Sequence, residues 1–241
     1  MIHQFIFAAP RPGLSEEAFQ RYWVEIHAQR YARHIPQIRR YLIDTRIPLP
    51  NETTAPLWGG VAEIWLANVE EQLASLQTPE FLQGARADEP NWAAFWLTRG
   101  LDTTAHEVLP GPPETRDNGM AKLLILSKRR EGLPLPAFKD YCLGSHAAKV
   151  LHVPGLRRYV QGHVVDGFYS VGEAPHDCVE QLWFDNLDAL IAAGGSVEHQ
   201  LVRADYRLFT EERYLHEMIV RENWIIGPEP RPYTPGAPAP E

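Results

Sequence analysis

The chain contains an internal repeat, and this repeat constrains the fold more than any other feature of the sequence. The segment FQRYWVEIHAQRYARHIPQIRRY at residues 19–41 returns near position 138 as FKDYCLGSHAAKVLHVPGLRRY. Phe19 and His27 recur as Phe138 and His146 at one offset, and the positions that follow recur at an offset shorter by one residue. Two copies that stay aligned over such a length indicate a duplicated structural unit.

The repeat extends beyond this segment. Trp65 returns as Trp183, and the triplet Arg-Ala-Asp at residues 86–88 returns at residues 203–205. Each copy is therefore about 110 residues long, the size of a small domain. These limits predict a first repeat at 1–109, a linker at 110–119, a second repeat at 120–226 and a proline-rich tail at 227–241. The tail is too rich in proline to fold alone and is interpreted as an extended arm lying on a neighbour.

Composition argues against several classes of protein. The net charge of −8, without a large cluster of Lys and Arg, disfavours nucleic acid or an anionic membrane surface as a partner. Cys142 and Cys178 lack the spacing of zinc ligands, so neither a structural metal nor a disulfide framework is indicated. The sequence has no secretory signal and no apolar run approaching the roughly 18 residues of a membrane span. We therefore expect a soluble cytoplasmic protein.

Each repeat shows the same order of predicted elements. In the first we expect strands at 2–8, 40–43, 61–66 and near 106–109, a helix that begins after Ser15 and ends at Pro36, and a helix at 68–76. In the second we expect strands at 121–127, 157–161 and 178–184, a helix at about 136–152 and a helix from 186. The aromatic segment WAAFW at 92–96 is expected to be buried. This is the split βαβ, or ferredoxin-like, order. It predicts an α+β chain in which two ferredoxin-like repeats close on each other as an α/β barrel.

Each repeat resembles the EthD-like family of the dimeric α/β-barrel superfamily. The family pattern places Phe-x-x-Tyr-x-x-x-x-His-Ala on the first helix after an arginine-containing turn, followed by Pro-Gly-Leu-x-x-Tyr. The matching residues are Arg11, Phe19, Tyr22, Trp23, His27 and Ala28 in the first repeat, and Arg130, Phe138, Tyr141, His146, Ala147, Pro154, Gly155, Leu156 and Tyr159 in the second. The chain departs from the pattern at Gln37-Ile38, and it has Cys142 where the first repeat has Trp23. These departures suggest that one repeat keeps a working pocket while the other is scaffold.

His27 and His146 are the best candidates for catalysis, because an imidazole with a pKa near neutrality can take up and return a proton without a cofactor. Tyr22 and Tyr141 lie five residues earlier and are candidates for donating a hydrogen bond to a carbonyl or enolate oxygen of the substrate. The alternative is equally open, since a histidine repeated on a helix also fits a core group bonded to a backbone carbonyl.

Asp88 and Asp205 occupy equivalent positions and are candidates for orienting an imidazole, but a surface salt bridge to the adjacent Arg86 or Arg203 is the favoured interpretation. Aromatic side chains that suit a flat substrate form the candidate substrate-binding set, although Trp65 and Trp183 repeat inside predicted strands, where tryptophan more often belongs to the core. The set is Trp23, Trp65, Tyr41, Tyr159 and Trp183.

The resemblance implies a cofactor-free enzyme, because similar proteins act as dehydratases, cyclases or isomerases on aromatic, polyketide-like or lactone substrates. We expect a lyase or isomerase in which His27 or His146 removes a proton next to a carbonyl while a tyrosine hydroxyl holds the enolate in a dry pocket. The expected partner is a small hydrophobic or aromatic substrate, and pairing into a homodimer is left open. Two rival functions are a cofactor-independent monooxygenase of electron-rich phenols and a non-catalytic binding protein of an oxidative degradation pathway.

Overall fold

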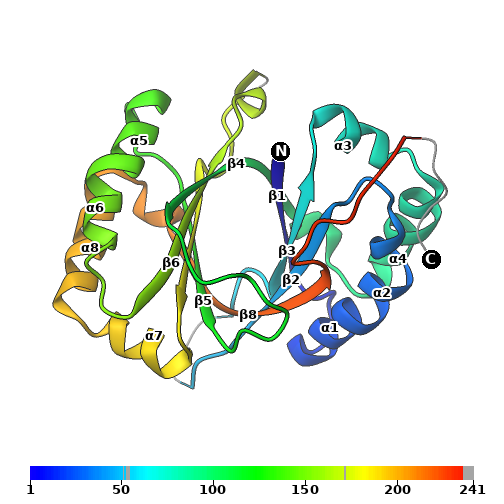
Figure 1. The fold of residues 1–241 in the computed structure, drawn as a ribbon, viewed down its shortest axis with the longest axis horizontal. Coiled ribbons are helices and arrows are strands. Elements are labelled where there is room, and N and C mark those ends of the chain that lie inside the picture. The colour runs from blue at the N-terminus through cyan, green and yellow to red at the C-terminus, as the bar shows by residue number, and fades with distance from the viewer. Residues whose placement is uncertain (51, 53–54, 171, 236–241) are drawn as a thin grey trace. The chain divides into compact units, whose positions relative to one another are not determined.

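The computed structural model describes residues 1–50, 52, 55–170 and 172–235 (Figure 1). It divides the chain into two compact units. The first comprises Met1–Asp102 together with the segment from Arg221 onward, and the second comprises Thr103–Val220. Two strands belong to both units, because β4 (Arg99–Leu109) and β8 (His216–Ile226) each begin in one unit and end in the other.

The sheet of the first unit contains β1 (Ile2–Ala8), β2 (Arg40–Arg46) and β3 (Gly60–Leu66). β3 lies between the other two and is antiparallel to both, so that Glu63 is opposite Phe5 on one side and opposite Leu42 on the other. Successive side chains of a strand point to opposite faces. Ala62, Ile64 and Leu66 accordingly join the apolar cluster under the helices, and Glu63 and Trp65 face the other way.

The first helical segment of this unit begins at Ser15, whose side chain accepts a hydrogen bond from the amide of Ala18. The sequence predicts one continuous helix here. The structure divides it into α1 (Glu16–Tyr22), a π-helical turn η1 (Trp23–His27), α2 (Ala28–Arg30) and a 3₁₀ turn η2 (Ala32–His34). The later elements are α3 (Val69–Ser75), the π-helical η3 (Glu80–Ala85), α4 (Arg86–Asp88), η4 (Glu89–Asn91) and η5 (Phe95–Leu97).

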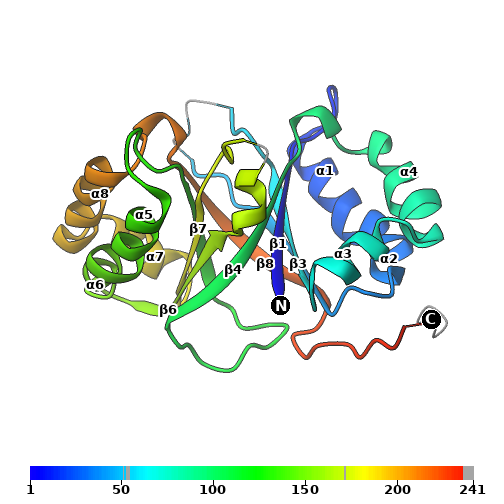
Figure 2. The ribbon, with the colours of Figure 1, turned by 90° about the horizontal axis from the view of Figure 1, so that it is seen from above.

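The second unit repeats this arrangement. Its strands are β5 (Ala121–Ser127), β6 (Leu156–Val164) and β7 (Cys178–Phe184), with β7 antiparallel between the other two. Its first helical segment again contains a π-helical turn, since α5 (Leu135–Tyr141) is followed by η6 (Cys142–His146) and α6 (Ala147–Val150). The remaining helices are η7 (Asp166–Ser170), α7 (Leu187–Gly194), α8 (Val197–Phe209) and η8 (Glu212–Tyr214). Figure 2 shows α5 to α8 together on one face of this unit's sheet.

Hydrogen bonding orders the eight strands β1-β3-β2-β8-β5-β7-β6-β4, which is the closed order of a barrel. Each unit has the split βαβ arrangement predicted from the order of elements. The predicted fold class, two ferredoxin-like repeats in one α+β barrel chain, is therefore confirmed.

Each unit has its own apolar core between its sheet and its helices. The core of the first unit contains Phe19, Trp23, Tyr41 and Trp92, and that of the second contains Phe138, Cys142, Tyr159 and Tyr206.

The expectation that the WAAFW segment is buried is only half right. Trp92 is 4% exposed and its two alanine neighbours are buried, but Phe95 and Trp96 are 47% and 56% exposed in the turn η5. The backbone of Ala9 and Arg11 pairs with this segment as far as Ala94, and the residues after Ala94 lie beyond this pairing, where the turn η5 begins.

The described part of the tail lies on the chain's own first unit. The guanidinium group of Arg231 donates hydrogen bonds of 2.7 Å to the carbonyls of Arg33 and Ile35 and of 2.9 Å to that of Ile38, at the end of the first helical segment. The ring of Tyr233 packs 4.8 Å from the guanidinium carbon of Arg39. The tail therefore caps a helix end, where a cation is favourable.

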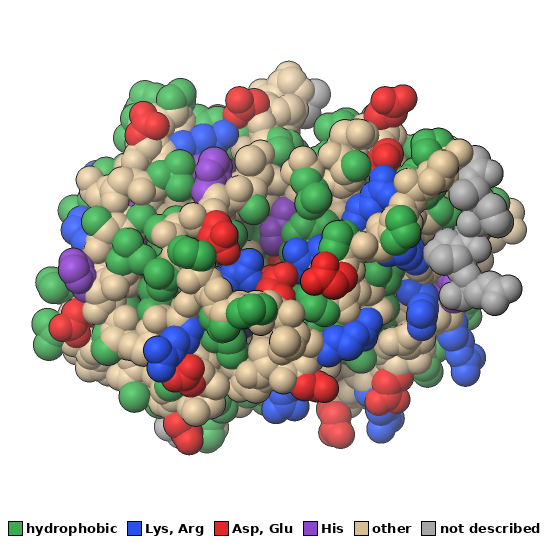
Figure 3. Space-filling model, in the orientation of Figure 1, with side chains coloured by type: hydrophobic (Ala, Val, Ile, Leu, Met, Phe, Trp, Pro, Cys, Tyr) green, Lys and Arg blue, Asp and Glu red, His purple; other side chains and the backbone are tan. Residues whose placement is uncertain are grey.

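No helix within the described residues has the length and apolar character needed to cross a membrane. On the face seen in Figure 3, acidic and basic side chains are interspersed.

Candidate functional site

In the first unit, the side chain of Asp88 joins two residues of the first helical segment. His27 ends the π-helical turn η1, and Asp88 ends α4. The Nδ1 atom of His27 lies 2.9 Å from Asp88 Oδ2, and the hydroxyl of Tyr22 donates to Asp88 Oδ1 over 2.9 Å. The amide of Asn91 donates to the same Oδ1 at 2.9 Å. Asp88 thus fixes the ring of His27 and links the first helical segment to α4.

The same carboxylate determines which nitrogen of His27 carries the proton. A carboxylate only accepts, so Nδ1 is the donor and Nε2 holds the lone pair. The indole Nε1 of Trp92 lies 3.1 Å from the same Nδ1. This contact is the weaker of the two, because a protonated Nδ1 cannot accept and the charge-assisted bond to Asp88 prevails. Burial lowers the pKa of His27, although Asp88 acts in the opposite direction. The imidazole is therefore neutral at pH 7.

The second unit contains the equivalent cluster. His146 Nδ1 lies 2.8 Å from Asp205 Oδ2, and the hydroxyl of Tyr141 donates to Asp205 Oδ1 over 2.8 Å. The ammonium group of Lys149 also donates to Asp205. These contacts lower the pKa of Asp205 to about 2 although burial alone would raise it.

A second carboxylate distinguishes the cluster of the second unit. Glu180 of β7 is fully buried, and its Oε2 lies 3.4 Å from His146 Nε2. The hydroxyl of Tyr206 donates to Glu180 over 2.7 Å, and that of Tyr159 donates to the other oxygen. Burial alone would lower the pKa of His146, but Glu180 and Asp205 together raise it to about 9. His146 is therefore an imidazolium at neutral pH.

The difference between the two histidines follows from substitutions at equivalent positions. Where the second repeat has Glu180, the first has Ala62, and where the second has Cys142, the first has Trp23. Trp23 and Ala62 both lie in the apolar core of the first unit. Because Ala62 has no carboxylate, His27 faces one carboxylate, whereas His146 faces two.

Comparison with known proteins identifies the family. The family model described as EthD domain matches residues 11–95 and 130–213, one match for each repeat. The chain belongs to the EthD family. A search of curated proteins finds no match.

Two solved structures of low sequence identity share the fold of this EthD protein, and a third aligns with less than half of the chain. An anthrone oxidase-like protein is 11% identical with a TM-score of 0.64, and the alignment covers 93% of this chain and 92% of the other. A candidate monooxygenase from Fusobacterium nucleatum is 6% identical with a TM-score of 0.53, covering 97% of this chain and 95% of the other. An EthD family protein from Bacillus halodurans is 25% identical with a TM-score of 0.36, covering 42% of this chain and 95% of the other.

The two aspartates do not form the salt bridges favoured by the sequence. Arg86 pairs with Glu89, and Arg203 pairs with Glu217. Residues two apart on a helix do not face the same side. Asp88 and Asp205 accordingly point inward to the histidines while the arginines point to solvent, and the interpretation as surface salt bridges is wrong.

The aromatic residues predicted to bind substrate do not come together. Trp23, Tyr41 and Tyr159 are at most 2% exposed and lie in the cores under the helices. Trp65 and Trp183 each lie on the face of the sheet that points away from the helices. The ring of Trp65 stacks on that of His3 at a centroid distance of 4.3 Å, and the ring of Trp183 lies 5.1 Å from the ammonium nitrogen of Lys122. Their role in binding stays a prediction.

Two buried contacts between a histidine and a glutamate escaped the sequence analysis. One is the contact of His146 with Glu180, and the other is His3 of β1, whose Nε2 lies 2.6 Å from Glu63 of β3. The available signal was a glutamate in the middle of a strand that is otherwise apolar, VAEIWL in the first repeat and CVEQLWF in the second. Within the described residues, no group of three or more His, Cys, Asp and Glu side chains is arranged to hold a metal ion.

Proposed function

We propose that the protein catalyses a cofactor-free proton transfer next to a carbonyl group of a small aromatic molecule, with His27 as the general base. The observation that carries the proposal is the contrast between the histidines. A general base needs a free lone pair at the working pH, which a neutral imidazole has and an imidazolium lacks. His27 is neutral and oriented by Asp88, whereas His146 is held as an imidazolium.

The surroundings of His27 suit a flat and weakly polar substrate. The ring centroid of Trp92 lies 4.7 Å from that of His27, and that of Tyr31 lies at 6.3 Å. Behind Trp92, the core residue Trp23 packs at a centroid distance of 4.9 Å. Aromatic side chains favour stacked or edge-on contacts with a planar ring.

In the proposed step, Nε2 of His27 takes a proton from the carbon next to the carbonyl. The electron pair of the broken C–H bond forms the enolate, and Asp88 stabilises the imidazolium. Return of the proton to another carbon gives an isomer, and its delivery to a leaving hydroxyl releases water. A positioned base of this kind contributes roughly 10² to 10⁴ in rate.

The geometry changes the role expected of Tyr22. Its hydroxyl proton is directed at Asp88 rather than at a substrate oxygen. We therefore propose that Tyr22 acts as a positioning residue, which holds the carboxylate that holds His27. Tyr141 stands in the same relation to Asp205.

Oxygenation of a phenolic substrate is the second candidate function, favoured by the likeness in fold to the anthrone oxidase-like protein and the candidate monooxygenase. The first step is the same deprotonation. The carbanion then transfers electrons to molecular oxygen and forms a C–O bond, and the peroxide anion takes back the proton from the imidazolium of His27. The resulting hydroperoxide loses water to leave a carbonyl. His27 serves both reactions, so the two are separated by the fate of the carbanion.

Deuterium incorporation from heavy water into a panel of aromatic carbonyl compounds and anthrones tests the proposal, with oxygen uptake followed in parallel. We expect exchange in the wild type, its loss in His27→Gln, and its retention in the matched variant His146→Gln after correction for folded protein. Oxygen uptake that depends on His27 would select the monooxygenase. Ligand binding that survives both substitutions, without exchange or oxygen uptake, would leave a non-catalytic binding protein.

A further inference from the structure

His163, near the end of β6 in the second unit, has one nitrogen with a partner and one without. Its Nε2 lies 2.9 Å from the Oε1 of Gln161. The amide nitrogen of Gln161 donates to the hydroxyl of Tyr159 at 2.6 Å and to the carbonyl of Cys142 at 2.8 Å, which fixes Oε1 as the acceptor. Nε2 of His163 therefore carries the proton, and Nδ1 holds a lone pair.

This lone pair is buried without a hydrogen-bond donor. His163 is 2% exposed, and its Nδ1 has no partner among the described residues. A buried acceptor left without a donor costs about 1 to 3 kcal/mol. Burial, together with nearby His106, lowers the pKa of His163 to about 4, so Nδ1 stays unprotonated at neutral pH. Nδ1 of His163 therefore needs a hydrogen-bond donor that does not belong to the chain.

Other polar groups gather around this imidazole. The ring of His106 on β4 lies 4.8 Å from that of His163. Lys139 of α5 contacts Asp166, which follows His163 by three residues, so its ammonium group lies at this end of β6; its charge lowers the pKa of both histidines. Lys139 donates to Asp166 over 2.8 Å, but Asp166 is 86% exposed. An exposed pair of this kind contributes at most about 1 kcal/mol, so an incoming anion can replace Asp166.

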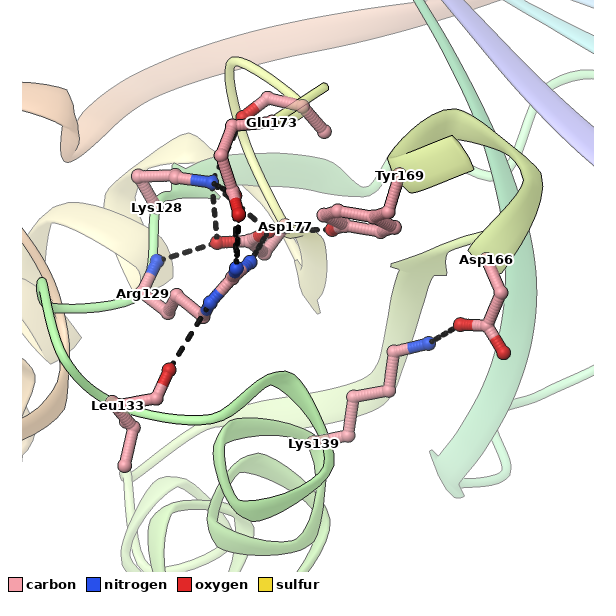
Figure 4. A network of polar contacts seen from close by, with 9 residues as sticks. Lys128, Arg129, Leu133, Lys139, Asp166, Tyr169, Glu173 and Asp177 are labelled. Atoms are coloured by element: carbon pink, nitrogen blue, oxygen red, sulfur yellow. Dashed lines mark hydrogen bonds and ion pairs between the residues drawn. The ribbon is translucent and has the colours of Figure 1, made fainter. Parts of the chain in front are cut away.

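Ion pairs and hydrogen bonds hold the segment between β6 and β7 at the end that leads into β7 (Figure 4). The guanidinium group of Arg129 contacts both oxygens of Glu173 at 2.7 and 2.8 Å and reaches buried Asp177 at 2.7 Å. The hydroxyl of Tyr169 donates to Asp177 over 2.5 Å. These contacts hold one end of the segment, whereas the contact between Lys139 and Asp166 at its other end is exposed to solvent.

The first repeat offers no equivalent site. Ile43 and Thr45 stand at the positions of Gln161 and His163, and Ile43 belongs to the apolar core. The polar groups therefore belong to the second repeat alone and are not part of the duplicated scaffold.

We propose that this corner of the second unit binds a small acid that also carries a hydroxyl group. The hydroxyl donates to Nδ1 of His163, and the carboxylate takes the place of Asp166 on Lys139. The site is separate from the proposed chemistry at His27, which lies in the first unit, so a failure of either proposal leaves the other standing.

Salicylate is the probe, because it carries a hydroxyl and a carboxylate on one ring. The full-length protein, labelled with ¹⁵N in its histidines, is titrated with salicylate and, in separate samples, with benzoate and with phenol. We expect the Nδ1 resonance of His163 to shift on binding of salicylate, and benzoate and phenol each to bind at least tenfold more weakly. Lys139→Met keeps the apolar stem and is expected to weaken salicylate binding about tenfold. The matched control Arg207→Gln removes an exposed cation on α8 and should leave binding unchanged.

Three results would overturn the proposal. The first is a His163 resonance that stays unchanged at saturating salicylate. The second is an Nδ1 that is already hydrogen-bonded in the free protein, which would assign the position to an ordered water. The third is equal affinity in Lys139→Met and the wild type. The resonance of His163 in the wild type tests the proposal even if a variant does not fold.

Discussion

Replacing Glu180 with glutamine tests whether charge holds the buried cluster of the second EthD repeat. The change keeps the size of the side chain and one acceptor oxygen, so that one of the two tyrosine hydroxyls keeps its acceptor, and it removes the charge that faces His146. A rise in pKa from 6.5 to about 9, to which Glu180 and Asp205 both contribute, corresponds to about 3 kcal/mol and sets the upper limit for the loss of Glu180's charge alone. The same figure is typical for the loss of one partner of a buried ion pair. The melting temperature should fall on the order of 10 °C.

The effect should depend on pH in a defined direction. Because the pKa of His146 is raised in the folded protein, its contribution is complete below pH 6.5 and is lost as the pH rises through about 9. The destabilisation caused by Glu180→Gln should therefore be large at pH 6 and much smaller near pH 10. The wild type should lose stability over this interval more steeply than the variant.

Urea unfolding at several pH values, followed by circular dichroism and by hydrogen exchange in the second unit, measures the effect. The control is Glu217→Gln, which removes the same charge from a solvent-exposed pair with Arg203. Exposed pairs contribute about 0 to 1 kcal/mol. If Glu180→Gln costs no more than Glu217→Gln at pH 6, the cluster is not held by charge and our assignment of an imidazolium to His146 is wrong.

Three further changes have expected outcomes. Asp88→Asn should lower the rate of deuterium exchange by about 10² or more, because it removes the charged group that orients His27. Substrate affinity should change little, because the site stays in place. Equal exchange rates in the variant and the wild type would count against His27 as the base. Arg129→Gln should speed amide exchange in residues 166–170 and 172–177 at least tenfold, since hydrogen bonds to charged groups contribute about 1.5 to 3 kcal/mol, with Arg130→Gln as the neighbouring control. Arg231→Ala should destabilise the first unit by about 2 kcal/mol in chemical unfolding through the loss of its bonds to three carbonyls, and an unchanged midpoint would show that the tail contributes nothing.

The fold could be predicted from the sequence because its signals are local and occur twice. Ser15, Asn68 and Asn186 each cap a helix with their side chains, as residues of these types commonly do. The alternation of apolar residues in the strands depends only on the two faces of a sheet. A second copy of each signal removed ambiguities that a single copy would have left.

The site was predicted only in part, because its geometry depends on residues far apart in the chain. The sequence identified His27 and His146, but nothing local shows that each ring meets an aspartate about sixty positions later. The orientation of Asp88 depends on α4, which follows a π-helical segment and is too short to show a periodic pattern. Glu180 was overlooked because a single charge in an apolar strand does not disturb the prediction of a strand.

The division of the two units along the chain has a consequence for synthesis on the ribosome. The second unit, Thr103–Val220, is one uninterrupted stretch, whereas the first unit needs residues from Arg221 onward. The later-made repeat therefore has its complete complement of residues before the earlier-made one does. Until Arg231 emerges, the carbonyls of Arg33 and Ile35 have no guanidinium to cap them. The amino-terminal repeat therefore cannot complete its structure, including this cap of its first helical segment, until the last part of the chain has been translated.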